Sequence, residues 1–294
     1  MQKKYFKTAF IGMACLWAFS AVLTSCSSDD NESESTEQPT IGRKLRQLTI
    51  TDVPITRATL DENGSAISAL WTAGDKATLL NVSAIPSELL YGEVAASSNA
   101  VTSTFTGSVS CDELDVVALI YPKVTPAVGV GTYSVVLSGQ KGTLTDIATH
   151  FHYVYGVGQV TPVTATTATA TIEEMKSLLA LCKFTFNDGT NPIPVKTLTI
   201  NYEGSGYPLT GTVTPSTDAG SVAVNPDRHE YWDEHQLTVT LDNEAYEVYV
   251  ALFPERVNTT FRFTVTGSAG TYTSTAKAKL NAGKYYPVNL TLTK

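Results

Sequence analysis

The chain of 294 residues is poor in charge, and its net charge is acidic. Only 16% of the residues are charged, and 28 Asp and Glu against 20 Lys and Arg give a formal net charge of −8. Nucleic-acid binding needs a basic surface that neutralises phosphates, so we expect no nucleic-acid partner. Beyond the N-terminal region, the chain also lacks an apolar run of the roughly 20 residues that a membrane-spanning helix requires.

Sequence motifs of the common enzyme classes are missing as well. The chain has no Gly-x-Ser-x-Gly elbow, no phosphate-binding glycine loop and no His-Glu-x-x-His helix. Carboxylate pairs such as Asp61-Glu62 and Glu173-Glu174 adjoin turn signals, where solvation explains them, so glycosidase chemistry does not follow. We therefore predict neither an enzyme nor a cofactor.

Histidine is scarce, with four residues in the chain. His150 and His152 would share one face of a strand, but no Cys, Asp or Glu stands nearby at ligand spacing, so we predict no metal site. His229 and His235 flank a charged stretch that contains Trp232. Trp232 is a weak candidate for contact with a ligand, against the alternative that it anchors its own loop.

The four cysteines fall into two groups. Cys15 and Cys26 lie in the N-terminal region, whereas Cys111 and Cys182 lie in the body of the chain. The second pair could form one disulfide in an oxidising compartment or be two buried thiols. Their apolar surroundings favour buried thiols.

The N-terminus has the pattern of a secretory signal. Three lysines within the first seven residues precede the apolar stretch 9–22, which is too short to span a bilayer. The run Leu23-Thr24-Ser25-Cys26 follows and resembles the lipobox of a bacterial lipoprotein, in which Cys26 would be acylated, for instance with palmitate. We predict a signal peptide over 1–25 and an acidic, Ser-rich tether over 26–44. The acidic residues after Cys26 resemble a signal for display on the outer face of the outer membrane.

From Leu45 onward, the pattern is that of an all-β protein. Short segments of β-branched and apolar residues at near-alternate positions are separated by turn signals such as Asn63-Gly64 and Ala282-Gly283. Expected strands cover residues 76–82, 101–105, 115–121, 133–137, 183–186, 195–202, 236–241, 247–253, 261–266 and 272–278. Residues 173–181 have helical spacing and are expected to form a short helix or turn. Trp71 is expected to pack into the core, with Gly74 turning the chain behind it.

The length after the signal is enough for two domains. The run Val117 to Lys123 is repeated, one residue shorter, as Val250 to Arg256, and each is an apolar strand stopped by proline. This echo indicates two domains of related topology, which we place at 45–168 and 169–294.

Four ordered motifs carry a resemblance to a known family. They are Thr56-Arg57-Ala58-Thr59-Leu60, Trp71-Thr72-Ala73-Gly74-Asp75-Lys76, Leu252-Phe253-Pro254, and the final segment 283–292, which reads Gly-Lys-Tyr-Tyr-Pro-Val-Asn-Leu-Thr-Leu. Together with the lipobox they resemble the fimbrillin family, the pilins and pilin-like lipoproteins of type V pili. The resemblance implies two tandem transthyretin-like Greek-key β-sandwich domains. It also implies a surface lipoprotein that polymerises by strand exchange with other pilin subunits, of its own or a paralogous kind, and so supports cell adhesion and biofilm formation.

The resemblance further implies two functional segments. An arginine-specific protease would cut between Arg57 and Ala58, with Arg43 and Arg46 as rival sites in a more flexible stretch. The C-terminal segment, in which Val288, Leu290 and Leu292 alternate with polar residues, would be the donor strand; the alternative is that it completes the second domain of its own subunit.

The biological role has a competing interpretation. A monomeric surface lipoprotein that binds glycan or a host protein through its loops would need neither the arginine nor an exchangeable strand. A capping or anchoring subunit of a pilus would share the fold. The position in a fibre, the protease and any host or bacterial surface ligand stay open at this stage.

Overall fold

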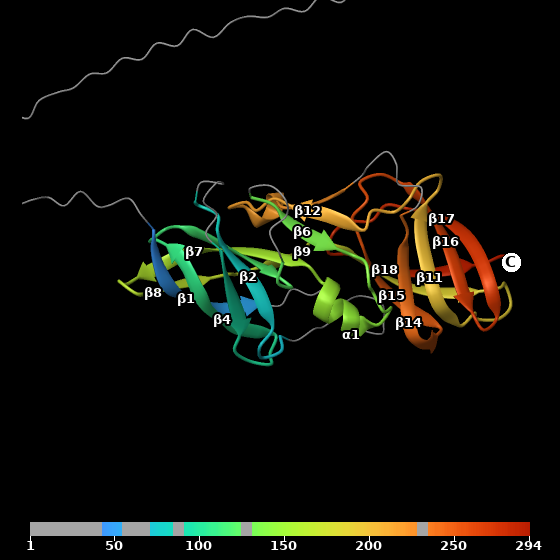
Figure 1. Ribbon diagram of the computed structural model, residues 1–294, viewed down its shortest axis with the longest axis horizontal. Coiled ribbons are helices and arrows are strands. Elements are labelled where there is room, and N and C mark those ends of the chain that lie inside the picture. Colours follow the sequence, from blue (N-terminus) through green and yellow to red (C-terminus); the bar gives the residue numbers. More distant parts are fainter. Residues whose placement is uncertain (1–42, 55–70, 85–90, 125–130, 228–234) are drawn as a thin grey trace, which may run out of the picture. The chain divides into compact units, whose positions relative to one another are not determined.

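The computed structural model describes residues 43–54, 71–84, 91–124, 131–227 and 235–294, and these are built almost entirely of β-strands (Figure 1). The all-β prediction is therefore confirmed. The strands are β1 (Lys44–Pro54), β2 (Lys76–Asn81), β3 (Tyr91–Ala96), β4 (Thr102–Cys111), β5 (Val116–Tyr121), β6 (Tyr133–Val136), β7 (Val154–Val163), β8 (Thr167–Thr171), β9 (Met175–Ser177), β10 (Ala180–Asn187), β11 (Val195–Tyr202), β12 (Thr210–Val213), β13 (Val224–Pro226), β14 (Leu237–Ala245), β15 (Glu247–Leu252), β16 (Thr259–Gly267), β17 (Gly270–Ala278) and β18 (Tyr285–Thr291). Within the described residues, no helix has the length and apolar composition needed to cross a bilayer.

The first sheet closes on itself. Its strands follow the order β5-β2-β3-β4-β1-β8-β7, and β7 pairs back with β5, so that seven strands form a ring to which β9 adds alongside β7. All seven strands contribute to one hydrophobic core, which includes the fully buried Leu48, Leu79, Phe105 and Leu119. Trp71 lies in the same core, as predicted, with its ring edge-on to Phe105 and to Tyr121.

The second half of the chain forms three smaller sheets. Their orders are β15-β10-β18, β14-β11-β16-β17 and β13-β12-β6. A second core joins them to the ring, since it contains Ala118 and Tyr155 from the ring as well as Phe184, Val250 and Phe263 from the later strands. β6 precedes β7 in the chain, yet it pairs with β12.

The strand pairing bears on where the chain divides. A division between residues 168 and 169 falls inside β8, and the first sheet continues through β9 to Ser177. The division into two domains at this point stays a prediction. The finer prediction of two transthyretin-like Greek-key sandwiches stays a prediction.

The expected helix at 173–181 is wrong. β9 occupies its centre and pairs with β7, with Met175 opposite Gly156, and β10 begins at Ala180. Apolar residues at 175, 178 and 179 suit a helix, but all three are buried here by strand pairing and core packing, which override a short periodic signal.

The helical structure lies elsewhere. A single turn, α1 (Leu144–Asp146), runs into the π-helical turn η2 (Ile147–Phe151), and a short 3-10 turn η3 (Ala219–Ser221) follows later. Thr143 caps α1, since its hydroxyl accepts from the backbone N–H of Asp146 at 3.2 Å. His150 therefore sits in a helical turn and does not share a strand with His152.

Candidate functional site

β1 is an internal strand of the ring, held along both edges (Figure 1). It runs antiparallel to β4, with Lys44 opposite Cys111, and parallel to β8, with Gln47 opposite Thr167. We call the position between β4 and β8 the β1 slot. Loss of β1 would leave unpaired backbone groups on both β4 and β8. Native proteins avoid such open sheet edges, because they pair readily with other strands.

The inward face of β1 is apolar. Leu48, Ile50 and Val53 are fully buried, and a bulge between Ile50 and Val53, with Asp52 at φ +54°, keeps all three on the core side. Full burial of such side chains contributes about 1.5–3 kcal/mol each, or roughly 4.5–9 kcal/mol for the three. The backbone carbonyl of Val53 also accepts a hydrogen bond of 3.0 Å from Trp71 Nε1.

A polar contact holds the N-terminal end of β1. Arg46 is 7% exposed; its Nε donates to the Thr164 carbonyl at 2.8 Å, and its Nη1 to Asp112 Oδ1 at 2.8 Å and to the Cys111 carbonyl. Arg43 donates to both carboxylate oxygens of Asp115, at 2.8 and 3.1 Å. We call Arg43, Arg46, Asp112 and Asp115 the arginine clamp.

Asp115 accepts hydrogen bonds from several donors of the clamp and its surroundings. It accepts hydrogen bonds from Asn81 Nδ2 at 2.7 Å and from the backbone N–H of Asp112 at 2.8 Å, besides those from Arg43. Burial by itself would raise the pKa of Asp115, but these donors outweigh burial and hold the pKa below its ordinary value. The carboxylate is therefore ionised in the folded protein at neutral pH.

The clamp overturns one expectation about proteolysis. Arg43 and Arg46 were expected in a flexible stretch, but Arg46 is a buried residue of β1 and Arg43 is ion-paired one residue before the strand. A protease needs an extended, accessible backbone around the bond it cuts, and paired β-strand backbone is not accessible. Neither arginine therefore suits cleavage in the folded chain.

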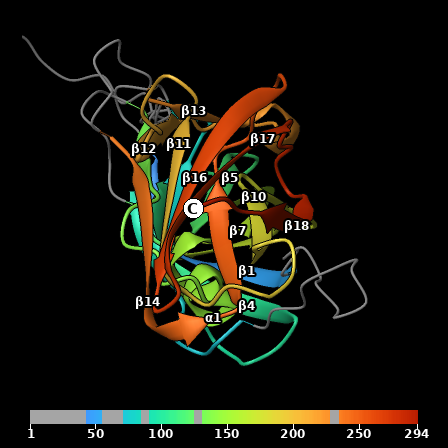
Figure 2. The same ribbon diagram turned by 90° about the vertical axis from the view of Figure 1, so that its right-hand side faces the viewer.

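The C-terminal strand β18 lies at the edge of its sheet, parallel to β10, with Leu181 opposite Tyr285 (Figure 2). Val288 and Leu290 are half-buried against the second core and Leu292 is 3% exposed, which places these three residues on one face. Pro287 is exposed. Proline suits an edge strand, because the N–H that proline lacks is not needed at the open edge. The second edge of the segment meets β17 at the bridge between Thr273 and Thr293.

The other expected site residues fall outside the described residues. These are Cys26, Arg57, Ala58 and Trp232. Of the two later cysteines, Cys111 and Cys182 are both buried and free, which confirms the expectation of buried thiols. Burial raises the pKa of Cys182 to about 12 and also raises that of Cys111.

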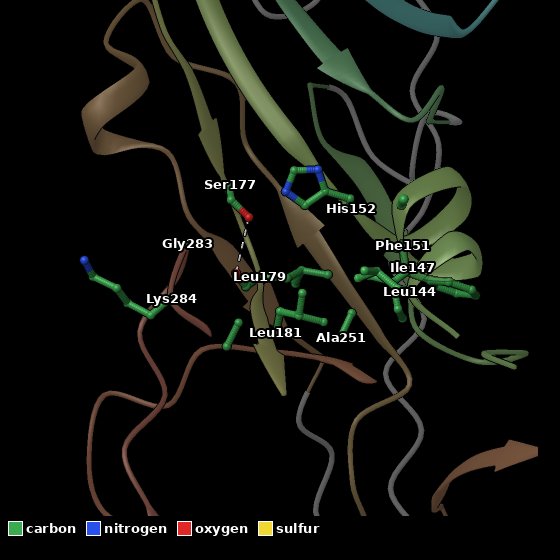
Figure 3. A pocket seen from close by; sticks show the side chains of 12 residues that line it. Leu144, Ile147, Phe151, His152, Ser177, Leu179, Leu181, Ala251, Gly283 and Lys284 are labelled. Carbon is green, nitrogen blue, oxygen red and sulfur yellow. Dashed lines mark hydrogen bonds between the residues drawn. The ribbon is translucent and has the colours of Figure 1, made fainter. Parts of the chain in front are cut away.

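A small cavity lies between η2 and strands β9, β10 and β15 (Figure 3). Its lining is mainly apolar, with Ile147, Phe151 and Leu179 among its residues, and its volume is about 30 Å³. Small-molecule sites usually measure about 300–1,000 Å³, so this cavity is a packing space and not a ligand site. No group of three or more His, Cys, Asp or Glu able to hold a metal ion occurs within the described residues.

Comparison with known families shows to which protein family the chain is related. The model of the fimbrillin-like family matches residues 56–294, which is most of the chain. The chain belongs to the fimbrillin-like family. The family resemblance carried by the four motifs is thus confirmed. The match begins just after β1, so β1 lies before the part of this fimbrillin-like chain that the family model matches.

Solved structures support the fold of this fimbrillin-like chain. A "putative cell adhesion protein" from Bacteroides uniformis has 16% identity and a TM-score of 0.53, with 86% of this chain and 94% of that chain covered. A second, with the same description, from Bacteroides ovatus has 14% identity and a TM-score of 0.52, with 84% and 92% covered. No curated protein sequence matches the chain.

The arginine clamp is the part of the site that the sequence reasoning missed. Its signal was available, because Arg46 has the same strand parity as Leu48 and Ile50 and must therefore face the core with them. A charged residue at such a position requires buried partners.

Proposed function

We propose that this fimbrillin-like chain is the lipid-anchored precursor of a pilus subunit that polymerises by strand exchange. Acylation at Cys26 would anchor the precursor in the outer membrane, on the cell surface. Cleavage between Arg57 and Ala58 would then release the segment that contains β1. A C-terminal strand presenting Val288, Leu290 and Leu292 from a neighbouring pilin would fill the vacated slot, and the assembled fimbrium would support adhesion and biofilm formation.

One observation carries the proposal: β1 is paired along both edges and buried, yet the family model begins only after it. An exchangeable strand would have both properties: it would be buried within the subunit, and it would lie outside the part of the chain that the family model matches. Its loss would leave an apolar slot with open backbone groups, which is the receptor side of β-augmentation.

The geometry of β18 supports the donor side. β18 runs parallel to its partner β10, as β1 does to β8, and both strands present alternate apolar residues to a core. A donor strand could therefore enter the slot in the direction of β1 with its apolar face inward. β18 is also a half-exposed edge strand, so releasing it would disturb less buried surface than releasing an internal strand would.

The position of Arg57 supports the cleavage site. It follows β1 by three residues, so a cut there frees the whole strand, whereas cuts at the clamped Arg43 or Arg46 would leave most of β1 attached. The finer fold that accompanies this function is two transthyretin-like sandwiches, as the family resemblance implies.

The test uses cells that express the full chain. Arg57→Ala should leave a surface protein that begins at Cys26 and forms no fibres, whereas Arg256→Ala, at an exposed arginine after β15, should leave assembly unchanged. Electron microscopy scores the fibres, and mass spectrometry reads the first residue of the surface form. Fibres whose subunits begin at Cys26 would contradict the proposal, and an unchanged chain that reaches the surface but forms no fibres would favour the monomeric, ligand-binding lipoprotein.

A further inference from the structure

The inward face of β1 carries one cation, Arg46, whereas Arg43, which pairs with Asp115, precedes the strand. Arg46 reaches three acceptors there, the Asp112 carboxylate and the carbonyl oxygens of Cys111 and Thr164. We call these three acceptors the Arg46 subsite. The rest of the inward face of β1, at Leu48, Ile50 and Val53, belongs to the hydrophobic core of the ring. A strand that fills the slot therefore meets polar acceptors at the Arg46 position and apolar side chains at the positions of Leu48, Ile50 and Val53.

Departure of β1 would strip the Arg46 subsite of its donor. The Cys111 carbonyl is buried, and leaving such an acceptor without a donor is unfavourable, whereas the half-exposed Asp112 carboxylate would keep part of its contact with water. An incoming strand that places a cation at this position would restore charge-assisted hydrogen bonds, which are roughly twice as strong as neutral ones. The subsite thus favours one register of a donor strand over others.

The C-terminal segment of this chain can supply that cation. Lys284 precedes Tyr286 by two residues and Val288 by four, as Arg46 precedes Leu48 and Ile50. Superposing Lys284 on Arg46 therefore puts Tyr286 at Leu48 and Val288 at Ile50, which keeps the alternation of the donor in phase with the slot as far as the bulge of β1. In its own subunit Lys284 is exposed, and Figure 3 shows its amine directed away from the neighbouring cavity.

A rival register has one advantage. If Leu290 took the place of Leu48, Pro287 would fall at Leu45, before the ladder with β8 begins at Gln47. In the Lys284 register, Pro287 falls at Thr49, inside that ladder. Gln47 donates to the Thr166 carbonyl, and alternate residues face the same edge, so Thr49 is a donor position that proline cannot fill.

The balance favours the Lys284 register. It forfeits one neutral backbone hydrogen bond, whereas the rival register puts Val288 against a carboxylate and two carbonyls. We propose that the Arg46 subsite sets the register of strand exchange by binding Lys284 from a second copy of this chain. The proposal rests on the strand-exchange function above and adds the residue pair, Lys284 with Asp112, that selects the donor and its alignment.

The affinity test uses the soluble full chain from Ser27, with a site for a sequence-specific protease inserted at residue 56. After cutting, β1 stays in its slot without a covalent link; we call this the nicked protein. A fluorophore on its N-terminus reports displacement of the β1 fragment by synthetic peptides of residues 283–294. Lys284→Ala in the peptide should raise the concentration needed for displacement by about 10- to 100-fold. The matched control Lys294→Ala, with the same loss of charge, should change it less than 3-fold.

The partner residue is tested on the same scale. For each peptide, the concentration needed for displacement is measured in nicked protein carrying Asp112→Asn. The ratio of this concentration for the Lys284→Ala peptide to that for the unchanged peptide should shrink several-fold. This ratio does not depend on how tightly β1 itself is held. An undiminished ratio would overturn the pairing of Lys284 with Asp112.

Cross-linking then reads the register directly. Gln47 and Ser108 lie opposite each other and are both exposed, so Ser108→Cys gives a thiol beside the slot. With oxidised glutathione as oxidant, a Tyr285→Cys peptide should form the disulfide in the Lys284 register, and an Asn289→Cys peptide in the rival one. Displacement without Lys284 dependence, with cross-linking at 289, would overturn the inference and leave strand exchange standing. Failure of every peptide to displace β1 would overturn exchange between copies and the inference with it.

Discussion

Truncation of Ile50 should weaken the hold of the slot on β1. Ile50 is fully buried at the centre of the strand, opposite Phe105 in β4 and Ala170 in β8. Replacing a buried Leu, Ile or Met by Ala costs about 2–5 kcal/mol, because apolar contact is lost and a cavity is left. Since about 1.4 kcal/mol is tenfold in an equilibrium constant, Ile50→Ala should weaken retention of β1 in the nicked protein by about 30- to 4,000-fold.

The nicked protein also provides the assay. Size-exclusion chromatography with mass spectrometry follows loss of the β1 fragment, and the fluorescence of Trp71 should change with it, because its indole N–H bonds to Val53 in β1. Gln47→Ala is the matched control, since Gln47 is an exposed residue of the same strand. If Ile50→Ala and Gln47→Ala release β1 equally slowly, the core contacts of β1 do not hold it, and the reasoning behind the slot fails.

Three further outcomes are expected. The lowered pKa of Asp115 means that its contribution to stability is present above its ordinary value of 3.8 and is lost as the pH falls through the lower folded value, so Asp115→Asn should flatten the fall of the urea midpoint below about pH 4; an unchanged slope would contradict this. With its pKa near 12, Cys182 should resist iodoacetamide at pH 8 in folded protein and react in urea, as peptide mass spectrometry would show, whereas alkylation in the folded state would disprove its burial. Trp71→Phe should leave the Val53 carbonyl without its donor and lower the free energy of unfolding by about 1–3 kcal/mol, measured by urea denaturation; a smaller loss would mean that the bond is dispensable.

Local patterns in the sequence predicted the strands well, because alternation and turn residues are local properties. The runs at 195–202 and 272–278 correspond closely to β11 and β17, and Trp71 lies in the core as expected. The segment at 173–181 failed for the opposite reason. Its apolar spacing fits a helix, and only the pairing of β9 with a strand from elsewhere in the chain decides the outcome.

The candidate site was only half visible in the sequence. The apolar face of the C-terminal segment could be read from its alternation, and its proposed donor role comes from the family resemblance, whereas the slot depends on β8, which no local pattern connects to β1. The arginine clamp could have been anticipated from the parity of Arg46, but Asp112 and Asp115 lie 66 and 72 residues along the chain from Arg46 and Arg43, the arginines that they bind. The closure of the ring by β5 and β7 is likewise a property of the folded chain.

The parallel pairing of β1 with β8 has a kinetic consequence. Thr51 and Thr171 are 120 residues apart in sequence, so this pairing has a high contact order and is slow to form. During folding, the rest of the ring can assemble while one position between β4 and β8 is still open. Any slowing of that final closure lengthens the time in which a strand from another molecule can enter first, and it should raise the yield of domain-swapped dimers without changing the native fold.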